Sequence, residues 1–194
     1  DYKNDHVHNF LNIIEKDTSR MEKLVSDLLI LSKIEQQEHR VPKDSVDISL
    51  IIKESLSILE PLIQKYKMKI ENNIVDNVFI IGQSDRLKDV FLNIFENNIK
   101  YSEPNKTIKI EALSFNKKLQ IKIIDQGIGM AKENIPRVTE RFFRIDPEKS
   151  KSVGGTGLGL AIVKHIITQH RGELRIESEL GKGSTFLITL PKTI

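Results

Sequence analysis

Gly154–Leu160 reads GGTGLGL and leads directly into the apolar run Leu160–Ile167, LAIVKHII. Glycine has no Cβ atom, so the backbone of this loop can approach a ligand closely. The apolar run predicts a helix whose first N–H groups and positive dipole end would point back at the loop. A glycine loop at a helix N-terminus favours phosphate binding. The alternative from this stretch alone is a flexible linker followed by a helix.

Two common phosphate loops do not match the sequence. The P-loop pattern requires a hydroxyl residue after its lysine, whereas Gly181–Thr185 (GKGST) places Gly183 there. The dinucleotide-binding loop follows an apolar strand, whereas Asp146–Ser152, just before this loop, is polar and turn-like. Such a segment suggests a movable lid. We therefore expect Ile145–Thr156 to be mobile without nucleotide and ordered with it.

The composition fits a globular protein and excludes several kinds of site. The chain has 194 residues, of which 39% are hydrophobic and 29% charged, enough for one domain and an appendage. Its net charge of +3 offers no electrostatic argument for nucleic acid binding. Cysteine is absent, which excludes disulfides and cysteine-based zinc sites and weakly favours a cytoplasmic location. No apolar run approaches the ~20 residues of a membrane span, and no signal-peptide pattern is present.

Residues 6–35 predict one long helix. Its apolar seam, Met21, Leu24, Leu28 and Leu31, has the spacing of a helical bundle or coiled coil. The seam needs a partner: either the chain's own globular part or, as we favour, a second subunit or an upstream helix. We expect residues 1–40 to belong to a helical bundle, 41–46 to be a linker within the polar stretch 36–46, and 47–194 to form a separate domain. Because the chain opens on Asp1, we expect it to be a piece of a longer protein.

After Asp47 the hydrophobic pattern changes. It predicts helices over residues 48–66, 85–101 and 158–169, with Pro61 kinking or ending the first, and short helix and loop over 131–144. It predicts strands over 68–75, 78–81, 107–115, 118–125, 172–179 and 184–190, with hairpin turns at 116–117 and 181–183. Several helices with a mixed, mostly antiparallel sheet predict an α+β sandwich with helices on one face.

Two further groups of residues carry candidate chemistry. Asp125 ends a predicted strand and is followed by Gly127 and Gly129; its carboxylate can accept hydrogen bonds from the exocyclic amine of adenine. The alternative is an ordinary Asp-Gly turn. On the predicted helix 85–101, Asn93, Asn97, Lys100 and Tyr101 share one face, which can hold Mg²⁺ through an amide oxygen and phosphate through the ammonium. The alternative is a solvated polar face.

Together these motifs resemble the ATP-binding catalytic domain of sensor histidine kinases in two-component systems. The motifs are, in order, N-x-x-x-N-x-x-K-Y, D-x-G-x-G, E-R-F-F-R, G-G-T-G-L-G-L and G-K-G-S-T-F, and the resemblance covers residues 47–194. The first helix is similar to the second helix of that family's dimerisation and phosphoacceptor domain. The resemblance implies a Bergerat-type α/β sandwich preceded by a bundle helix, with ATP and Mg²⁺ as ligands.

The resemblance also implies roles for individual residues. Asn97 would coordinate Mg²⁺ and act in catalysis with Lys100 and Arg144, which would contact phosphate. Asp125 would bind the adenine amine. Phe142 and Phe143 would anchor the lid. The nucleotide would be contacted by Asn93, Asn97, Lys100, Tyr101, Asp125, Gly127, Gly129, Gly155, Thr156, Gly157, Leu158, Gly159 and Thr185.

The sequence departs from the family at the phosphoacceptor. The family motif H-[DE]-x-x-[TN]-P is absent, and His6 and His8 have neither the acidic neighbour nor the Thr-Pro pair that the motif requires. Their position fits the turn between the two bundle helices, so we expect the acceptor histidine to lie upstream. His39, His165 and His170 are expected to have surface roles.

The expected function is phosphoryl transfer from ATP to a histidine of the parent chain, within a homodimer, and then to a response-regulator aspartate. The parent is expected to be anchored in the membrane upstream, with the kinase part in the cytoplasm. Two alternatives stay open. One is an ATPase of the same fold, using Glu96 beside Asn97 to activate water. The other is a nucleotide-binding dimerisation module without transfer activity.

Overall fold

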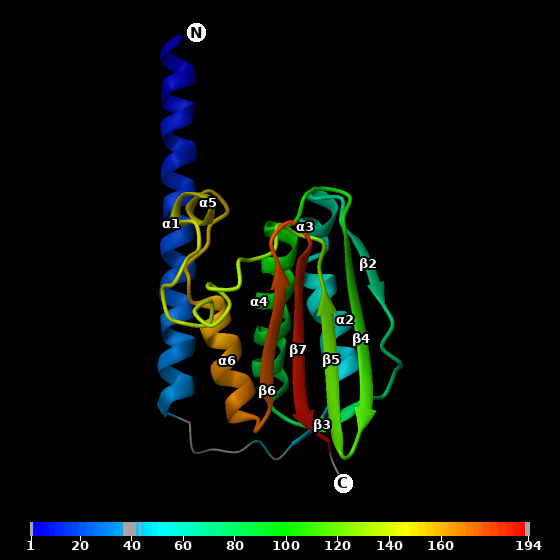
Figure 1. Cartoon of the computed structure of the whole chain (residues 1–194). Helices are drawn as coiled ribbons and strands as arrows, with labels where there is room; N and C mark the ends of the chain where they lie inside the picture. The colour runs from blue at the N-terminus through cyan, green and yellow to red at the C-terminus, as the bar shows by residue number, and fades with distance from the viewer. Residues whose placement is uncertain (1, 37–41, 43, 193–194) are drawn as a thin grey trace.

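Five strands form the central sheet in the order β2-β4-β5-β7-β6 (Figure 1). A computed structural model describes residues 2–36, 42 and 44–192. β2 (Lys69–Asn72) pairs parallel with β4 (Thr107–Phe115), and the other pairs are antiparallel: β4 with β5 (Lys118–Ile124), β5 with β7 (Gly183–Pro191), and β7 with β6 (Glu173–Glu179). The sheet is therefore mixed and mostly antiparallel, as predicted.

The hairpin between β4 and β5 turns at Asn116 and Lys117, as the sequence predicts. Both residues adopt positive φ, 44° and 59°, as the two central positions of a type I′ turn require. Along β4, β5 and β7, buried apolar residues alternate with more exposed ones, which is the period of a sheet with one covered face. The second predicted hairpin forms as β6 and β7.

Three helices cover that face of the sheet: α2 (Ile48–Ile58), α4 (Ser84–Lys100) and α6 (Gly159–Gln169) (Figure 1). They supply most of the helical side of one continuous core, in which Phe91 and Phe95 of α4 stack with ring centroids 6.0 Å apart. The predicted α+β sandwich with helices on one face is thus confirmed.

The predicted helix 48–66 is broken near Pro61, as expected. The chain forms α2 and then α3 (Glu60–Lys65), with Leu59 between them. Pro61 lacks the N–H that would donate to the preceding turn, so it lies in the first turn of the new helix. Asp47 caps the N-terminus of α2. Its carboxylate accepts from Ser49 N at 2.9 Å and Leu50 N at 3.4 Å.

Several boundaries differ from the sequence prediction. Ser45 and Val46, expected to end the linker, instead belong with Asp47 to β1 (Ser45–Asp47), which pairs with β3 (Phe79–Ile81). Most of the expected linker lies outside the described residues. Residues 131–144 form successive turns and no helix, because Pro136 cannot donate a backbone hydrogen bond. The expected mobile segment 145–156 contains a short helix, α5 (Pro147–Ser152); its mobility stays a prediction.

α1 (Tyr2–Gln36) is one long helix that extends beyond the rest of the molecule (Figure 1). It includes His6 and His8, so the expectation that they lie in an interhelical turn is wrong. Near its C-terminal end Leu31 and Ile34 are buried in the core, whereas Met21 of the same seam is 69% exposed. The chain's own globular part therefore packs against the C-terminal end of the seam. None of the helices in the described part of the chain combines the length and apolar character needed to cross a membrane.

Candidate nucleotide-binding site

Asp125 follows β5 and is held by backbone donors. Its Oδ1 accepts from Gly127 N at 2.8 Å and from Ser184 N at 3.1 Å. With its amide oriented by its neighbours, Asn98 donates to Asp125 Oδ2 at 3.3 Å and to the Ile94 carbonyl at 3.1 Å. Asp125 is 6% exposed. Its carboxylate is therefore fixed in one orientation at the end of the central sheet.

The close packing beside this carboxylate requires a glycine at position 127. A Cβ atom at this position would lie 2.7 Å from the Tyr101 carbonyl, 2.9 Å from Asp125 Oδ1 and 3.0 Å from Ser102 Oγ. Ser102 Oγ is buried and has no hydrogen-bond partner among the described residues. An unpaired buried hydroxyl is unfavourable, so this site offers a free donor and acceptor close to Asp125.

The other predicted residues at this end surround Asp125. Gly129 lies against the Glu179 carbonyl, and Thr185 of β7 pairs with Ile124, the residue before Asp125. Tyr101 ends α4, and its carbonyl accepts from Ile128 N at 3.0 Å. The structure thus brings Tyr101, Asp125, Gly127, Gly129 and Thr185 together.

The polar face of α4 continues away from Asp125. Asn93 Nδ2 donates to the Asp89 carbonyl at 2.8 Å, and its Oδ1 lies 2.6 Å from where a Cβ of Gly159 would be. Gly159 is the first residue of α6, so the Asn93 amide faces the N-terminus of that helix. Asn97 is half-buried. Lys100 Nζ donates to Glu96 Oε1 at 2.7 Å.

The glycine loop closes on itself and on Arg144. Arg144 donates to the Thr156 carbonyl at 3.0 Å, and Gly155 N donates to the Ser150 carbonyl at 2.7 Å. Thr156 Oγ1 accepts from Leu158 N at 3.3 Å, just before α6 begins. Thr156, Leu158, Gly159 and Arg144 therefore gather around the N-terminus of α6, as the sequence predicts for a phosphate loop.

The two predicted lid anchors behave differently. Phe142 is 56% exposed, so its side chain does not pack into the core, and its role as a lid anchor stays a prediction. It is held through its backbone, because Phe142 N donates to the Gly157 carbonyl at 2.9 Å. Phe143 is half-buried, and the Arg137 guanidinium lies 4.3 Å from its ring centroid, a cation–π contact.

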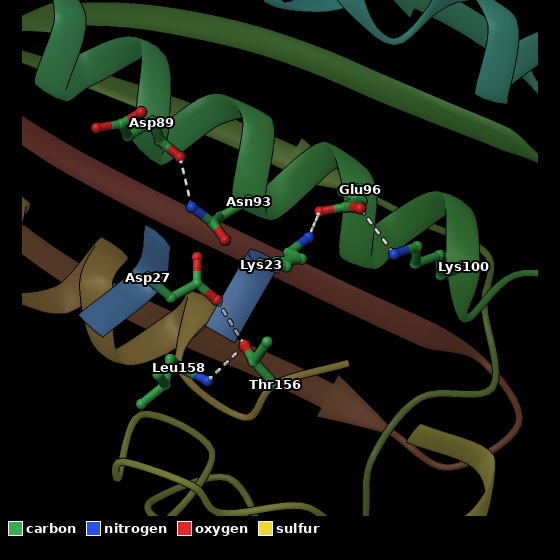
Figure 2. Close-up of polar contacts among 8 residues, drawn as sticks. All are labelled: Lys23, Asp27, Asp89, Asn93, Glu96, Lys100, Thr156 and Leu158. Carbon is green, nitrogen blue, oxygen red and sulfur yellow. Dashed lines mark hydrogen bonds and ion pairs between the residues drawn. The ribbon is translucent and has the colours of Figure 1, made fainter. Parts of the chain in front are cut away.

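Two residues of α1 contact the glycine loop and the polar face of α4, and sequence reasoning missed both. Figure 2 shows Lys23 paired with Glu96 of α4, and Asp27 accepting from Thr156 Oγ1 at 2.6 Å. Asn98 and Ser102 were also missed. The helical period of α4 places Asn98 four residues after buried Ile94, and that signal was available in the sequence.

Burial and neighbouring charges shift the pKa values of the acidic groups in opposite directions. Burial raises the pKa of Asp125 above its usual range, although the N–H groups of Gly127 and Ser184 partly offset it. Burial likewise raises the pKa of Asp27, against the hydrogen bond from Thr156 and the charge of Lys23. Burial alone would also raise the pKa of Glu96, but Lys23 and Lys100 together lower it below its usual range.

Comparison with known proteins gives a consistent result. Residues 82–194, more than half of the chain, match the family of histidine kinase-, DNA gyrase B- and HSP90-like ATPases. The chain is 32% identical over 188 residues to the sensor-like histidine kinase SenX3 of Mycolicibacterium smegmatis, covering 97% of this chain and 49% of that protein. It is 33% identical over 176 residues to the phosphate regulon sensor protein PhoR of Pseudomonas aeruginosa, covering 91% and 40%. The chain thus spans about half the length, or less, of these curated relatives.

Two solved histidine kinase structures have a similar arrangement. The chain resembles the mycobacterial sensor histidine kinase MprB with a TM-score of 0.67 at 29% identity, covering 78% of this chain and 99% of that one. It resembles the Acinetobacter baumannii histidine kinase AdeS with a TM-score of 0.74 at 25% identity, covering 91% and 81%.

Proposed function

The chain belongs to the family of histidine kinase-, DNA gyrase B- and HSP90-like ATPases and its relatives are sensor histidine kinases, so we propose that it binds Mg-ATP for phosphoryl transfer to a histidine. The observation that carries the proposal is that the candidate site has two ends, each suited to a different part of a nucleotide. One end has a buried carboxylate and a hydroxyl that is unpartnered among the described residues, and the other has a glycine loop with a helix N-terminus.

At the first end, Asp125 suits adenine rather than guanine. Backbone donors hold its Oδ1, and Oδ2 faces the Asn98 amide with lone pairs that can accept from an exocyclic amine. Guanine presents a carbonyl at that position, which a carboxylate repels. The Ser102 hydroxyl supplies a second polar contact, because it has no hydrogen-bond partner among the described residues. We propose that the adenine ring occupies this end.

At the second end, the phosphates would meet the N-terminus of α6. The N–H groups that begin this helix and the Arg144 guanidinium are donors for phosphate oxygens. The described residues contain no cluster of three or more His, Cys, Asp or Glu side chains that could hold a metal. That fits Mg²⁺ bound through one amide oxygen, proposed as Asn97, with phosphates and waters completing its shell. Mg²⁺ would neutralise phosphate charge.

The proposed reaction needs little covalent chemistry from the protein. A neutral imidazole nitrogen uses its lone pair to form an N–P bond with the γ-phosphorus, the bond from that phosphorus to the β,γ-bridging oxygen breaks, and ADP leaves. The phosphoryl group then passes to a carboxylate oxygen of a response-regulator aspartate, which regenerates the histidine. This chain would position the nucleotide and stabilise charge with Lys100, Arg144 and loop N–H groups.

A water-activating role for Glu96 is less well supported. Two ammonium groups, Lys23 and Lys100, bond to its carboxylate and lower its pKa. A carboxylate stabilised in its charged form is a weak general base. In the structure without nucleotide, these two ion pairs disfavour Glu96 as the base that activates water.

We propose that the parent protein is a homodimer joined through the bundle that contains α1. Exposed apolar side chains such as Phe10, Leu11 and Ile14 leave much of this helix without a partner within the described part of the chain. A receiver domain would take the phosphoryl group, and the kinase part would work in the cytoplasm, where ATP is present.

Calorimetry with Mg-ATP and Mg-GTP tests the proposal. We expect the unmodified chain to bind Mg-ATP and to bind Mg-GTP poorly. Asp125→Asn should weaken Mg-ATP binding by ~1.5–3 kcal/mol, the usual value of a hydrogen bond to a charged group. If the amide oxygen of the substituted side chain takes the place of Asp125 Oδ1, the new NH₂ group faces the Asn98 amide and the adenine amine. Both of these groups are donors, so the NH₂ group cannot accept from them. Asp85→Asn, at an exposed carboxylate on α4, is the matched control. Equal affinities in all three proteins would reject Asp125 as the adenine ligand.

A further inference from the structure

Asn98 of α4 contacts Asp125, the residue proposed to bind adenine. Its side-chain nitrogen donates to Asp125 Oδ2 at 3.3 Å and to the Ile94 carbonyl, one turn earlier on the same helix, at 3.1 Å. In the opposite orientation the amide oxygen would face these two acceptors. Both hydrogens of the NH₂ group are therefore used, and the bond to the α4 backbone fixes the direction of the hydrogen that points to Asp125.

Burial makes this contact important, because both side chains are removed from water. Asn98 is 2% exposed, and Asp125 is buried as well. A buried carboxylate stays charged only where donors replace the water that it has lost. Burial raises the pKa of Asp125, the N–H groups of Gly127 and Ser184 lower it, and no charged side chain among the described residues contributes to the shift. Neutral N–H donors therefore have to hold this carboxylate in its charged form.

Three donors leave one acceptor position on Asp125. An ionised carboxylate has about four lone-pair positions, two on each oxygen. Gly127 N and Ser184 N donate to Oδ1 at 2.8 Å and 3.1 Å, and Asn98 takes one position on Oδ2. The second position on Oδ2 has no donor among the described residues, and it matches one hydrogen of an exocyclic amine. A protonated Oδ2 would instead point its own hydrogen at the amine, and adenine would lose this bond.

We propose that Asn98 is a positioning residue for adenine recognition, which holds Asp125 as a charged acceptor with one lone pair left for the exocyclic amine. This inference rests on the proposed function, because it requires adenine to bind at Asp125. In this arrangement Asn98 acts through Asp125 and not on the nucleotide itself. A side chain that served only the packing of α4 would affect every nucleotide alike, so the two roles are distinguishable.

The test compares Mg-ATP with the Mg²⁺ complex of purine riboside triphosphate, which carries hydrogen in place of the amine. Calorimetry on the full chain across a pH series gives the ratio of the two affinities, which isolates the amine because both ligands have the same triphosphate. Asn98→Leu is close in size and removes both N–H donors. Val90→Ala, at a buried position about two turns earlier on α4, is the control, since it lowers stability without removing a donor to Asp125. Carbon-13 NMR of the Asp125 carboxyl group measures its pKa in each free protein.

In the unmodified chain, the ratio should favour Mg-ATP at least about tenfold while Asp125 is charged, as expected for a hydrogen bond to a charged group. The ratio should fall as the pH drops through the pKa of Asp125. Asn98→Leu should raise this pKa in the free protein and the pH at which the ratio falls, each by at least about one pH unit. The sign follows because loss of a donor disfavours the charged form. Val90→Ala should shift neither quantity.

An unchanged pKa of Asp125 in Asn98→Leu would overturn the inference, as would a raised pKa without a shift in the pH at which the preference for Mg-ATP falls. Equal binding of the two triphosphates by the unmodified chain at every pH, or no binding of either, would instead reject the proposed function. Should Asn98→Leu fail to fold, Asn98→Ala, which needs no additional space, decides by the same two measurements.

Discussion

Ser102 is the residue at which we expect bound nucleotide to supply a missing hydrogen bond. It is 7% exposed, and its hydroxyl has no hydrogen-bond partner in the described part of the chain. A group like this destabilises the free protein and benefits a complex that supplies the missing bond. We expect Ser102→Ala to leave the melting temperature unchanged or higher, and to weaken Mg-ATP binding by about 0.5–1.5 kcal/mol.

Thermal unfolding and calorimetry on the same samples check this split. Ser55→Ala is the matched control, because Ser55 is also buried but donates to the Ile51 carbonyl at 2.8 Å. That variant should alter stability without altering nucleotide affinity. A Ser102→Ala protein with normal affinity and a lowered melting temperature would show that the hydroxyl serves the fold alone.

Two glycines of the loop before α6 are constrained differently, one by backbone conformation alone and the other by backbone conformation and packing. Gly154 and Gly157 both have positive φ, 72° and 78°. A Cβ at Gly154 would meet nothing within 4 Å, whereas one at Gly157 would lie 2.9 Å from Phe142 Cα. Gly154→Ala should therefore cost only the left-handed backbone strain, ~1–2 kcal/mol. Gly157→Ala should cost more and should separate the loop from Phe142.

Hydrogen exchange at the Phe142 amide measures the difference, because this amide donates to the Gly157 carbonyl. We expect faster exchange in Gly157→Ala and unchanged exchange in Gly154→Ala. Mg-ATP affinity should fall further in the first variant, since the donors that begin α6 follow this loop directly. Identical exchange and affinity in the two variants would contradict the packing argument.

The stability of the whole molecule should depend on pH through His170. Its Nδ1 donates to the Ile166 carbonyl at 2.7 Å, and its Nε2 accepts from Gln83 N at 3.0 Å, so it joins the end of α6 to the start of α4. His170 is 2% exposed, so the expectation of a surface role is wrong for this residue. Burial lowers its pKa below 6.5, against the bond to Ile166. The native state therefore binds fewer protons than the unfolded state below pH 6.5, and protonation would also break the bond from Gln83.

We expect the free energy of unfolding to fall as the pH drops below about 6.5, by up to about 1.4 kcal/mol per pH unit from this residue, until the native pKa is reached. Denaturant titrations across that range measure the slope. His170→Gln should be less stable at neutral pH but lose this part of the slope, whereas His165→Gln should retain it. An unchanged slope in His170→Gln would show that another group carries the pH dependence.

The sequence by itself determined the class of fold and most of its elements, because these depend on local patterns. Alternating residues predicted the β4–β5 hairpin, the apolar stripe of α4 predicted its core face, and Pro61 predicted the break after α2. The motifs around Asp125 and Gly157 likewise predicted a nucleotide site, because backbone geometry near a ligand restricts residue type over a few positions. Residues 131–144 were misassigned because turns and a short helix have similar local signals.

Only the tertiary structure decided what α1 does. Its seam predicted a partner but not which one, since an apolar stripe fits a second subunit as well as the chain's own core. Asp27 and Thr156 are 129 positions apart in the chain, and no local pattern relates them. The burial of the Ser102 hydroxyl and the charge of the cavity beside Asn93, between α1 and α4, also arise from several elements meeting in space. Such contacts depend on the path of the whole chain, which sets both the docked position of α1 and the chemistry of the surface that it covers.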